Sequence, residues 1–178
     1  EVVSGGQTMN PSTKDLLDAV GRVNADAVVI LPNNSNIIMA AQSAAGLSEV
    51  PCAVVPTKSV PQAFSALFSA DETASLEENV ENMTSAFADT KTGEVTTAIK
   101  DSKDAHDNPI HNGDVIGIAD GSIEAVGSSV EDVVMSLLDT MEAEDADTLT
   151  LLAGEDFSDE QLDALVERIE SRFDELEV

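Results

Sequence analysis

The sequence predicts an α/β fold in two lobes, a parallel-sheet N-terminal lobe with helices on both faces and a mixed α/β C-terminal lobe containing a β-hairpin. Up to about residue 90, short apolar runs alternate with helical segments, which is the order of a parallel sheet covered by helices. Later, Asp120-Gly121 separates two apolar runs, a strong hairpin signal. We therefore expect a domain over 1–90 with polar loops and a domain over 91–178 with the hairpin and an acidic surface.

The first lobe follows from apolar spacing and capping residues. Asn10-Pro11 joins an N-cap residue to proline at the first helical position. Ser75 and Glu78 have capping-box spacing. The predicted elements, in order, are a helix over about 11–23, a buried strand over 27–31, a helix capped within 33–36 and ended by Gly46, a strand over 53–55, a helix opened by Pro61 that carries Phe64, Leu67 and Phe68, and a helix from Leu76 to Phe87.

The second lobe is predicted to mix antiparallel strands with two helices. Alternating apolar and polar residues over 95–99 favour a half-exposed strand. The remaining predicted elements are strands over 115–119 and 123–126, a helix capped by Ser128 or Ser129 and reaching Met141, a strand over 148–152, and a helix capped by Ser158 whose apolar face ends at Phe173. We expect residues 101–112 to form a polar loop and 142–147 an acidic one.

Composition restricts the partners and the location. Formal net charge is -27, with most acidic residues in the C-terminal half, so nucleic acid and anionic membrane surfaces are disfavoured as partners. No run approaches the roughly 18 apolar residues of a membrane span, so we expect no membrane insertion. The single cysteine, Cys52, and the lack of a leader pattern predict a cytoplasmic protein. Both ends resemble strands cut short, so we expect a piece of a longer protein.

Polar residues gather where the predicted strands of the first lobe end. The segment Gly5–Thr13 is expected to follow a strand at 1–3, and Asn33–Asn36 and Lys58 follow the next two strands. These places share the carboxyl edge of a parallel sheet, where α/β folds bind ligands. The simpler interpretations are capped turns and a solvated lysine. The candidate ligand- or partner-binding residues are Gly5, Gly6, Gln7, Thr8, Asn10, Ser12, Thr13, Asn33, Asn34, Asn36 and Lys58.

No residue is predicted to be catalytic or to bind metal. His106 and His111, with Asp104 and Asp107, have no recognised metal-ligand spacing, so a solvated loop is favoured. Cys52 stands among apolar residues and is interpreted as a small hydrophobic side chain. The sequence contains no Walker phosphate loop, no dinucleotide fingerprint and no nucleophile, histidine and acid motif.

Three segments resemble one known family. They are Gly-Gly-Gln-Thr-Met-Asn-Pro-Ser-Thr at 5–13, Leu-Pro-Asn-Asn-Ser-Asn-Ile-Ile at 31–38 and Gly-Glu-Val-Thr-Thr-Ala at 93–98. Together they resemble the C-terminal domain of the fatty acid kinase A subunit, of the dihydroxyacetone kinase-like or Dak phosphatase family, which is distantly similar to DegV. The resemblance covers nearly the whole chain.

The resemblance implies a protein partner and a larger parent, which is a kinase subunit. The parent would add an N-terminal kinase domain that binds ATP and Mg, and a middle domain with a Zn site; neither cofactor is expected on this chain. The partner would be a DegV-like fatty-acid-binding protein, whose acyl carboxylate the parent phosphorylates. The first hypothesis is therefore a non-catalytic docking and recognition domain. The alternatives are a small-ligand module for a carboxylate or polyol, and an architectural domain that forms a homodimer.

Overall fold

The computed structural model describes residues 1–5, 9–104 and 107–178. The chain divides into two compact units, Glu1–Thr90 and Lys91–Val178, called the first and second unit below. Helices occur in both units, and both parallel and antiparallel strand pairs are present, so the predicted α/β class is confirmed.

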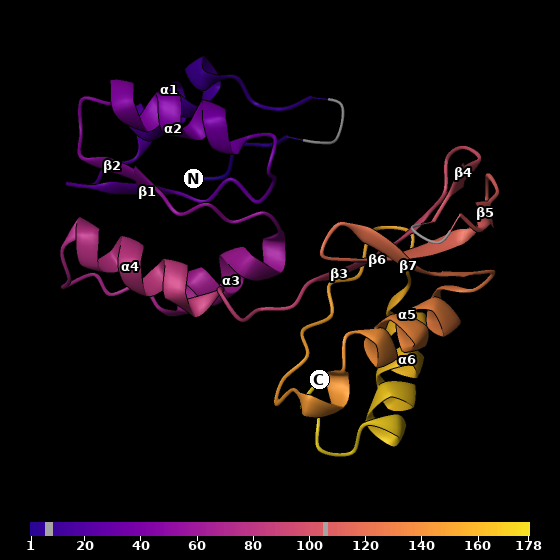
Figure 1. Cartoon of the computed structure of the whole chain (residues 1–178). Coiled ribbons are helices and arrows are strands. Elements are labelled where there is room, and N and C mark those ends of the chain that lie inside the picture. Colours follow the sequence, from indigo (N-terminus) through magenta and orange to yellow (C-terminus); the bar gives the residue numbers. More distant parts are fainter. Residues whose placement is uncertain (6–8, 105–106) are drawn as a thin grey trace. The chain divides into compact units, whose positions relative to one another are not determined.

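The first unit is a short parallel sheet between two pairs of helices (Figure 1). Strand β1 (Val28–Ile30) pairs with β2 (Cys52–Val54) in parallel, with Ile30 opposite Val54. Ile30 and Val54 pack towards α1 (Thr13–Arg22) and α2 (Ile38–Leu47). Val29 and Val55 pack towards α3 (Val60–Phe68) and α4 (Leu76–Ala86). Side chains of adjacent strand residues point to opposite faces, which explains why helices cover both sides.

Helix starts in the first unit differ in part from the prediction. Helix α1 begins at Thr13, because Ser12 is the N-cap and forms a capping box with Asp15, so Asn10 is not the cap. Helix α2 begins after Ile37 without a side-chain cap and continues through Gly46 to Leu47. The predicted box of α4, Ser75 with Glu78, is confirmed. The predicted strand at 1–3 is absent.

The second unit contains a three-stranded antiparallel sheet in the order β3-β6-β7. Its strands are β3 (Gly93–Thr97), β6 (Val115–Ala119) and β7 (Ser122–Gly127). Asp120 and Gly121 both have positive φ, 48° and 87°, as the tight β6–β7 turn requires, so the predicted hairpin is confirmed. The expected polar loop over 101–112 instead contains a short antiparallel pair, β4 (Ser102–Lys103) and β5 (Pro109–Ile110).

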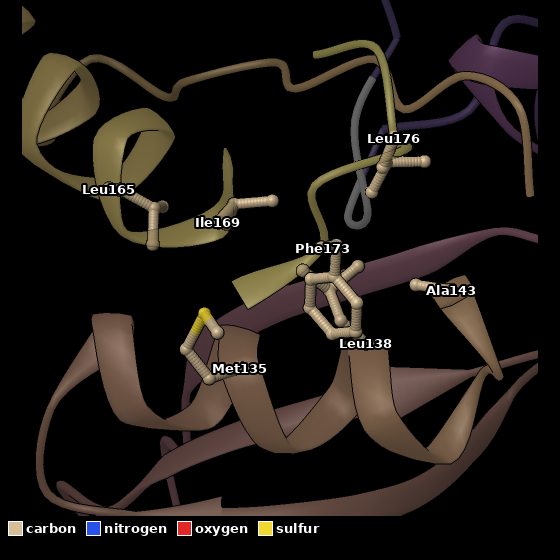
Figure 2. Close-up of a cluster of buried hydrophobic side chains, with 7 residues drawn as sticks. All are labelled: Met135, Leu138, Ala143, Leu165, Ile169, Phe173 and Leu176. Carbon is tan, nitrogen blue, oxygen red and sulfur yellow. The ribbon is translucent and has the colours of Figure 1, made fainter. Parts of the chain in front are cut away.

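Two helices complete the second unit. Helix α5 (Val130–Thr140) lies against the three-stranded sheet, and a short 3-10 turn, η1 (Ala143–Asp145), follows it. Helix α6 (Asp159–Arg172) packs on α5 through a shared apolar cluster (Figure 2). The buried members of this cluster are Met135, Leu138, Ala143, Leu165, Ile169, Phe173 and Leu176.

The prediction of a strand over 148–152 was wrong. Only one parallel bridge forms there, between Thr148 and Glu177, supported by Leu149 N–H donating to the Glu177 carbonyl at 2.7 Å. Leu149 and Leu151 instead pack against the α5–α6 cluster. The apolar run is therefore explained by core packing rather than by a sheet.

Candidate functional site

The candidate site lies at the carboxyl edge of the β1–β2 sheet. Ile30 pairs with Val54, and the chain continues in step beyond both strands, with Val55 N–H donating to the Ile30 carbonyl at 3.1 Å. Asn33 is three residues past Ile30, and Thr57 is three residues past Val54. The parallel register therefore brings these two polar residues together.

Asn33 and Thr57 form a closed pair of hydrogen bonds. The Thr57 hydroxyl donates to Asn33 Oδ1 at 2.8 Å and accepts from the Asn33 backbone N–H at 3.2 Å. Thr57 is fully buried, and Asn33 has a left-handed φ of 58°, which asparagine tolerates better than most residues. The pair thus joins the segment before α2 to the segment before α3.

The other predicted residues of this edge are partly used by local turns. Asn34 Oδ1 accepts from Asn36 N–H at 2.9 Å, and its carbonyl accepts from Ile37 N–H at 3.0 Å. Lys58 is exposed, and its backbone N–H donates to Gln62 Oε1 at 2.7 Å. In the described part of the chain its ammonium group has no ion-pair partner. We call Asn33, Asn34, Asn36, Thr57 and Lys58 the polar edge.

Several predicted site residues of the first loop, Gly5–Thr13, have structural roles. Gly6, Gln7 and Thr8 lie outside the described residues. A Cβ on Gly5 would come within 2.9 Å of Pro11 Cδ, so this close approach favours glycine. The Ser12 hydroxyl accepts from Asp15 N–H at 3.2 Å and donates to Asp15 Oδ2 at 2.7 Å. The bond from the Ser12 hydroxyl to Asp15 Oδ2, and a second from the Ser12 backbone N–H to the same oxygen at 2.9 Å, hold the pKa of Asp15 below its usual value.

A surface hollow of about 380 Å³ lies beside this loop. Asn10, Asp15 and Asp18 line it, and the Asp18 carboxylate is paired with Lys14 Nζ at 3.1 Å. Arg22 also lines it, but its guanidinium is paired with the Glu1 carboxylate at 2.9 Å. Two acidic side chains and an already paired arginine make this hollow unfavourable for a carboxylate ligand.

Comparison with known proteins decides the family. The family model for the C-terminal domain of FakA-like proteins, FakA being the A subunit of fatty acid kinase, matches residues 1–178. The chain belongs to this family. The resemblance predicted from the three sequence segments is therefore confirmed for this FakA-like C-terminal domain.

Curated relatives of the domain are much longer proteins. Protein YloV of Bacillus subtilis (strain 168) is 44% identical over 178 residues, which is 99% of this chain and 32% of the relative. Uncharacterized proteins of Staphylococcus haemolyticus and Staphylococcus aureus are 40% and 37% identical, each over 99% of this chain and 32% of the relative. The domain thus spans about a third of the length of the curated relatives it matches.

The predicted site residues come from two stretches of the chain, the loop at 5–13 and the polar edge. Asn33, Asn34 and Asn36 lie along one turn, and Lys58 follows Thr57 on the neighbouring segment. Within the described ranges, no hydrogen bond joins Asn10, Ser12 or Thr13 to this polar edge. Thr13 is the first residue of α1. Sequence reasoning missed Thr57, although its equal spacing with Asn33 from two paired strands was a usable signal.

The domain offers little conventional catalytic or metal chemistry in its described parts. No group of three His, Cys, Asp or Glu residues among them is arranged to hold a metal ion. His111 Nδ1 lies 3.9 Å from Asp101 Oδ1 on an exposed surface, and His106 is outside the described residues. Partial burial raises the pKa of the Cys52 thiol, which disfavours the nucleophilic thiolate. No helix in the described ranges is long and apolar enough to cross a membrane.

Proposed function

We propose that this domain is the non-catalytic recognition part of a bacterial kinase subunit. It docks a DegV-like fatty-acid-binding protein, whose acyl carboxylate the parent protein phosphorylates with ATP. The observation that carries the proposal is the family match over all 178 residues, while the curated relatives are about three times as long. We assign ATP, Mg and Zn to the other domains of the parent. This domain contributes by holding the fatty-acid-loaded partner close to the kinase site.

The hydrogen bonding of the polar edge supports docking over small-ligand binding. Asn33 and Thr57 satisfy each other, and Asn34 is used by its own turn. A carboxylate or polyol would have to compete with these bonds, whereas a protein partner can contact a preformed surface without breaking them. Asn36 and the Lys58 ammonium remain exposed at this surface and offer polar contacts.

The net charge of -27 also favours a partner whose docking surface is basic. A docking partner with a basic patch would be attracted over several ångströms, and added salt would screen this attraction. We therefore expect association to slow as ionic strength rises. A second copy of this domain would carry the same charge, which disfavours the architectural homodimer.

A titration tests the proposal directly. The domain and the full-length parent protein are each titrated with the fatty-acid-loaded and the empty partner at low salt. The proposal predicts that the domain alone binds the partner, with an affinity that decreases as salt increases. Binding by the full-length parent without any binding by the domain would refute the docking role.

Variants of the loops then test where recognition occurs. Asn10→Ala and Asn34→Ala are compared with Asn24→Ala, which changes an exposed asparagine between α1 and β1, outside the two loops. We expect weaker partner binding for the loop variants and unchanged binding for the control, with circular dichroism confirming that all remain folded. Unchanged loop chemical shifts on adding a fatty acid or glycerol would distinguish docking from the small-ligand alternative.

A further inference from the structure

Helix α3 has an inverted pattern of burial. Its buried side chains are two alanines, Ala63 and Ala66, at 5% and 0% exposure. Its large apolar side chains point outwards, with exposures of 47% for Val60, 43% for Phe64, 52% for Leu67 and 87% for Phe68. A helix that served only the core would bury its phenylalanines and leucine, because burial of each contributes roughly 1.5–3 kcal/mol.

These outward residues form one continuous stripe. Positions 60, 64, 67 and 68 follow the spacing that places residues on one side of a helix, and α3 contains no charged residue. We call Val60, Phe64, Leu67 and Phe68 the α3 stripe. Contiguous exposed apolar surface of this kind marks an interaction site more often than scattered apolar residues do.

The α3 stripe is continuous with the polar edge and is followed along the chain by acidic residues. Lys58 and Ser59 lead directly from the polar edge into Val60, and Ser59 caps the helix. Beyond Phe68 the chain continues into exposed Asp71 and Glu72. Helix α4, which packs beside α3, adds further exposed acids, Glu77, Glu78 and Glu81. An apolar centre with a polar rim is the usual anatomy of a protein interface.

We infer that the α3 stripe is the apolar centre of the docking surface, and that it receives an apolar patch with a lysine- and arginine-rich border on the partner protein. The inference rests on the proposed function and adds the location and the chemistry of the contact. The basic border complements the acids that follow Phe68, Asp71 and Glu72. The polar edge forms the opposite rim, beginning at Lys58.

A second copy of this domain is a poorer occupant. Two copies would bring the same acidic border, including Asp71 and Glu72, against itself. We therefore expect the domain to remain monomeric when the partner is absent.

The test uses the whole domain and the recombinant fatty-acid-binding partner. The double variant Leu67→Ser/Phe68→Ser removes two exposed side chains and leaves the buried alanines of α3 unchanged. Ile99→Ser is the matched control, because Ile99 is an 86% exposed apolar residue of the second unit. Glu72→Lys tests the charged border, with Glu170→Lys on α6 as its control. Calorimetric titration gives each Kd, and light scattering gives each mass.

We expect the double variant to raise Kd at least about tenfold, as loss of central apolar anchors does. Ile99→Ser and Glu170→Lys should leave Kd within about twofold, and Glu72→Lys should weaken binding and reduce its dependence on salt. Wild-type binding with an unaffected double variant would overturn the inference while leaving the docking function intact. Absence of wild-type binding would overturn the docking function itself. A concentration-dependent dimer abolished in the double variant would assign the α3 stripe to a second copy and refute the inference.

Discussion

Replacing Thr57 with valine tests how the polar edge is held together. The change keeps the shape of the side chain but removes its hydroxyl, which donates to Asn33 Oδ1 and accepts from Asn33 N–H. Each hydrogen bond contributes about 1 kcal/mol, and Thr57 is fully buried, so we expect the free energy of unfolding of the first unit to fall by about 2 kcal/mol. Loss of both bonds also removes the support for the left-handed backbone of Asn33.

Hydrogen exchange measured by mass spectrometry reports the loss of stability in each unit separately. A loss of about 2 kcal/mol should lower the protection of β1 and β2 amides about thirtyfold. Strand β6 of the second unit serves as the internal control. Thr57→Ser keeps the hydroxyl and loses only a methyl group, so it should cost about 1 kcal/mol. Wild-type protection of β1 and β2 in Thr57→Val would refute the reasoning.

The remaining predictions concern capping and packing. Ser12→Ala should lower the free energy of unfolding by about 1 kcal/mol in urea titrations, because Ser12 caps α1; an unchanged midpoint would show that the cap contributes nothing. Ser12 lowers the pKa of Asp15 in the folded state. The ionised Asp15 carboxylate therefore contributes to folding stability above the unfolded-state pKa near 3.8, and this contribution is lost as pH falls through the folded-state pKa. The stability difference between wild type and Ser12→Ala should therefore shrink below about pH 4, and a difference that grows there would contradict this assignment. Gly117→Ala should cost roughly 1–3 kcal/mol, since its new Cβ would lie 3.0 Å from Val133 Cγ1; thermal unfolding at the wild-type temperature would show that α5 and the sheet adjust freely. Ile169→Ala should cost roughly 2–5 kcal/mol by leaving a cavity in the α5–α6 cluster, and a loss below about 1 kcal/mol in urea titration would mean that the cluster collapses to fill it.

The sequence predicted the elements whose pattern is local. Alternating apolar runs and helical spacing were sufficient for β1, β2 and the four helices of the first unit, but the strand expected at 1–3 is absent. The Asp120-Gly121 turn was equally clear, because both residues adopt the positive φ that a tight hairpin needs. The strand expected over 148–152 failed for a tertiary reason, since its leucines are used by packing on α5 and α6.

The candidate site was harder to predict because the hydrogen bonds that organise it join distant segments. Asn33 and Thr57 are 24 residues apart, and only the strand register shows that they meet. Ser12 was predicted as a binding residue, but its hydroxyl caps α1. The sequence placed Phe64 and Phe68 on a helix without showing that the inner face of α3 consists of alanines. Which face is exposed depends on what packs beneath the helix.

A competition assay tests the docking role most directly. In this assay the full-length parent protein is given ATP and its proposed fatty-acid-loaded partner, phosphorylation of the fatty acid is measured, and excess isolated domain is added as a competitor. The account predicts inhibition by the wild-type domain that is relieved by raising the partner concentration, and much weaker inhibition by Leu67→Ser/Phe68→Ser. Full kinase activity in the presence of a saturating excess of the folded wild-type domain would contradict the central claim.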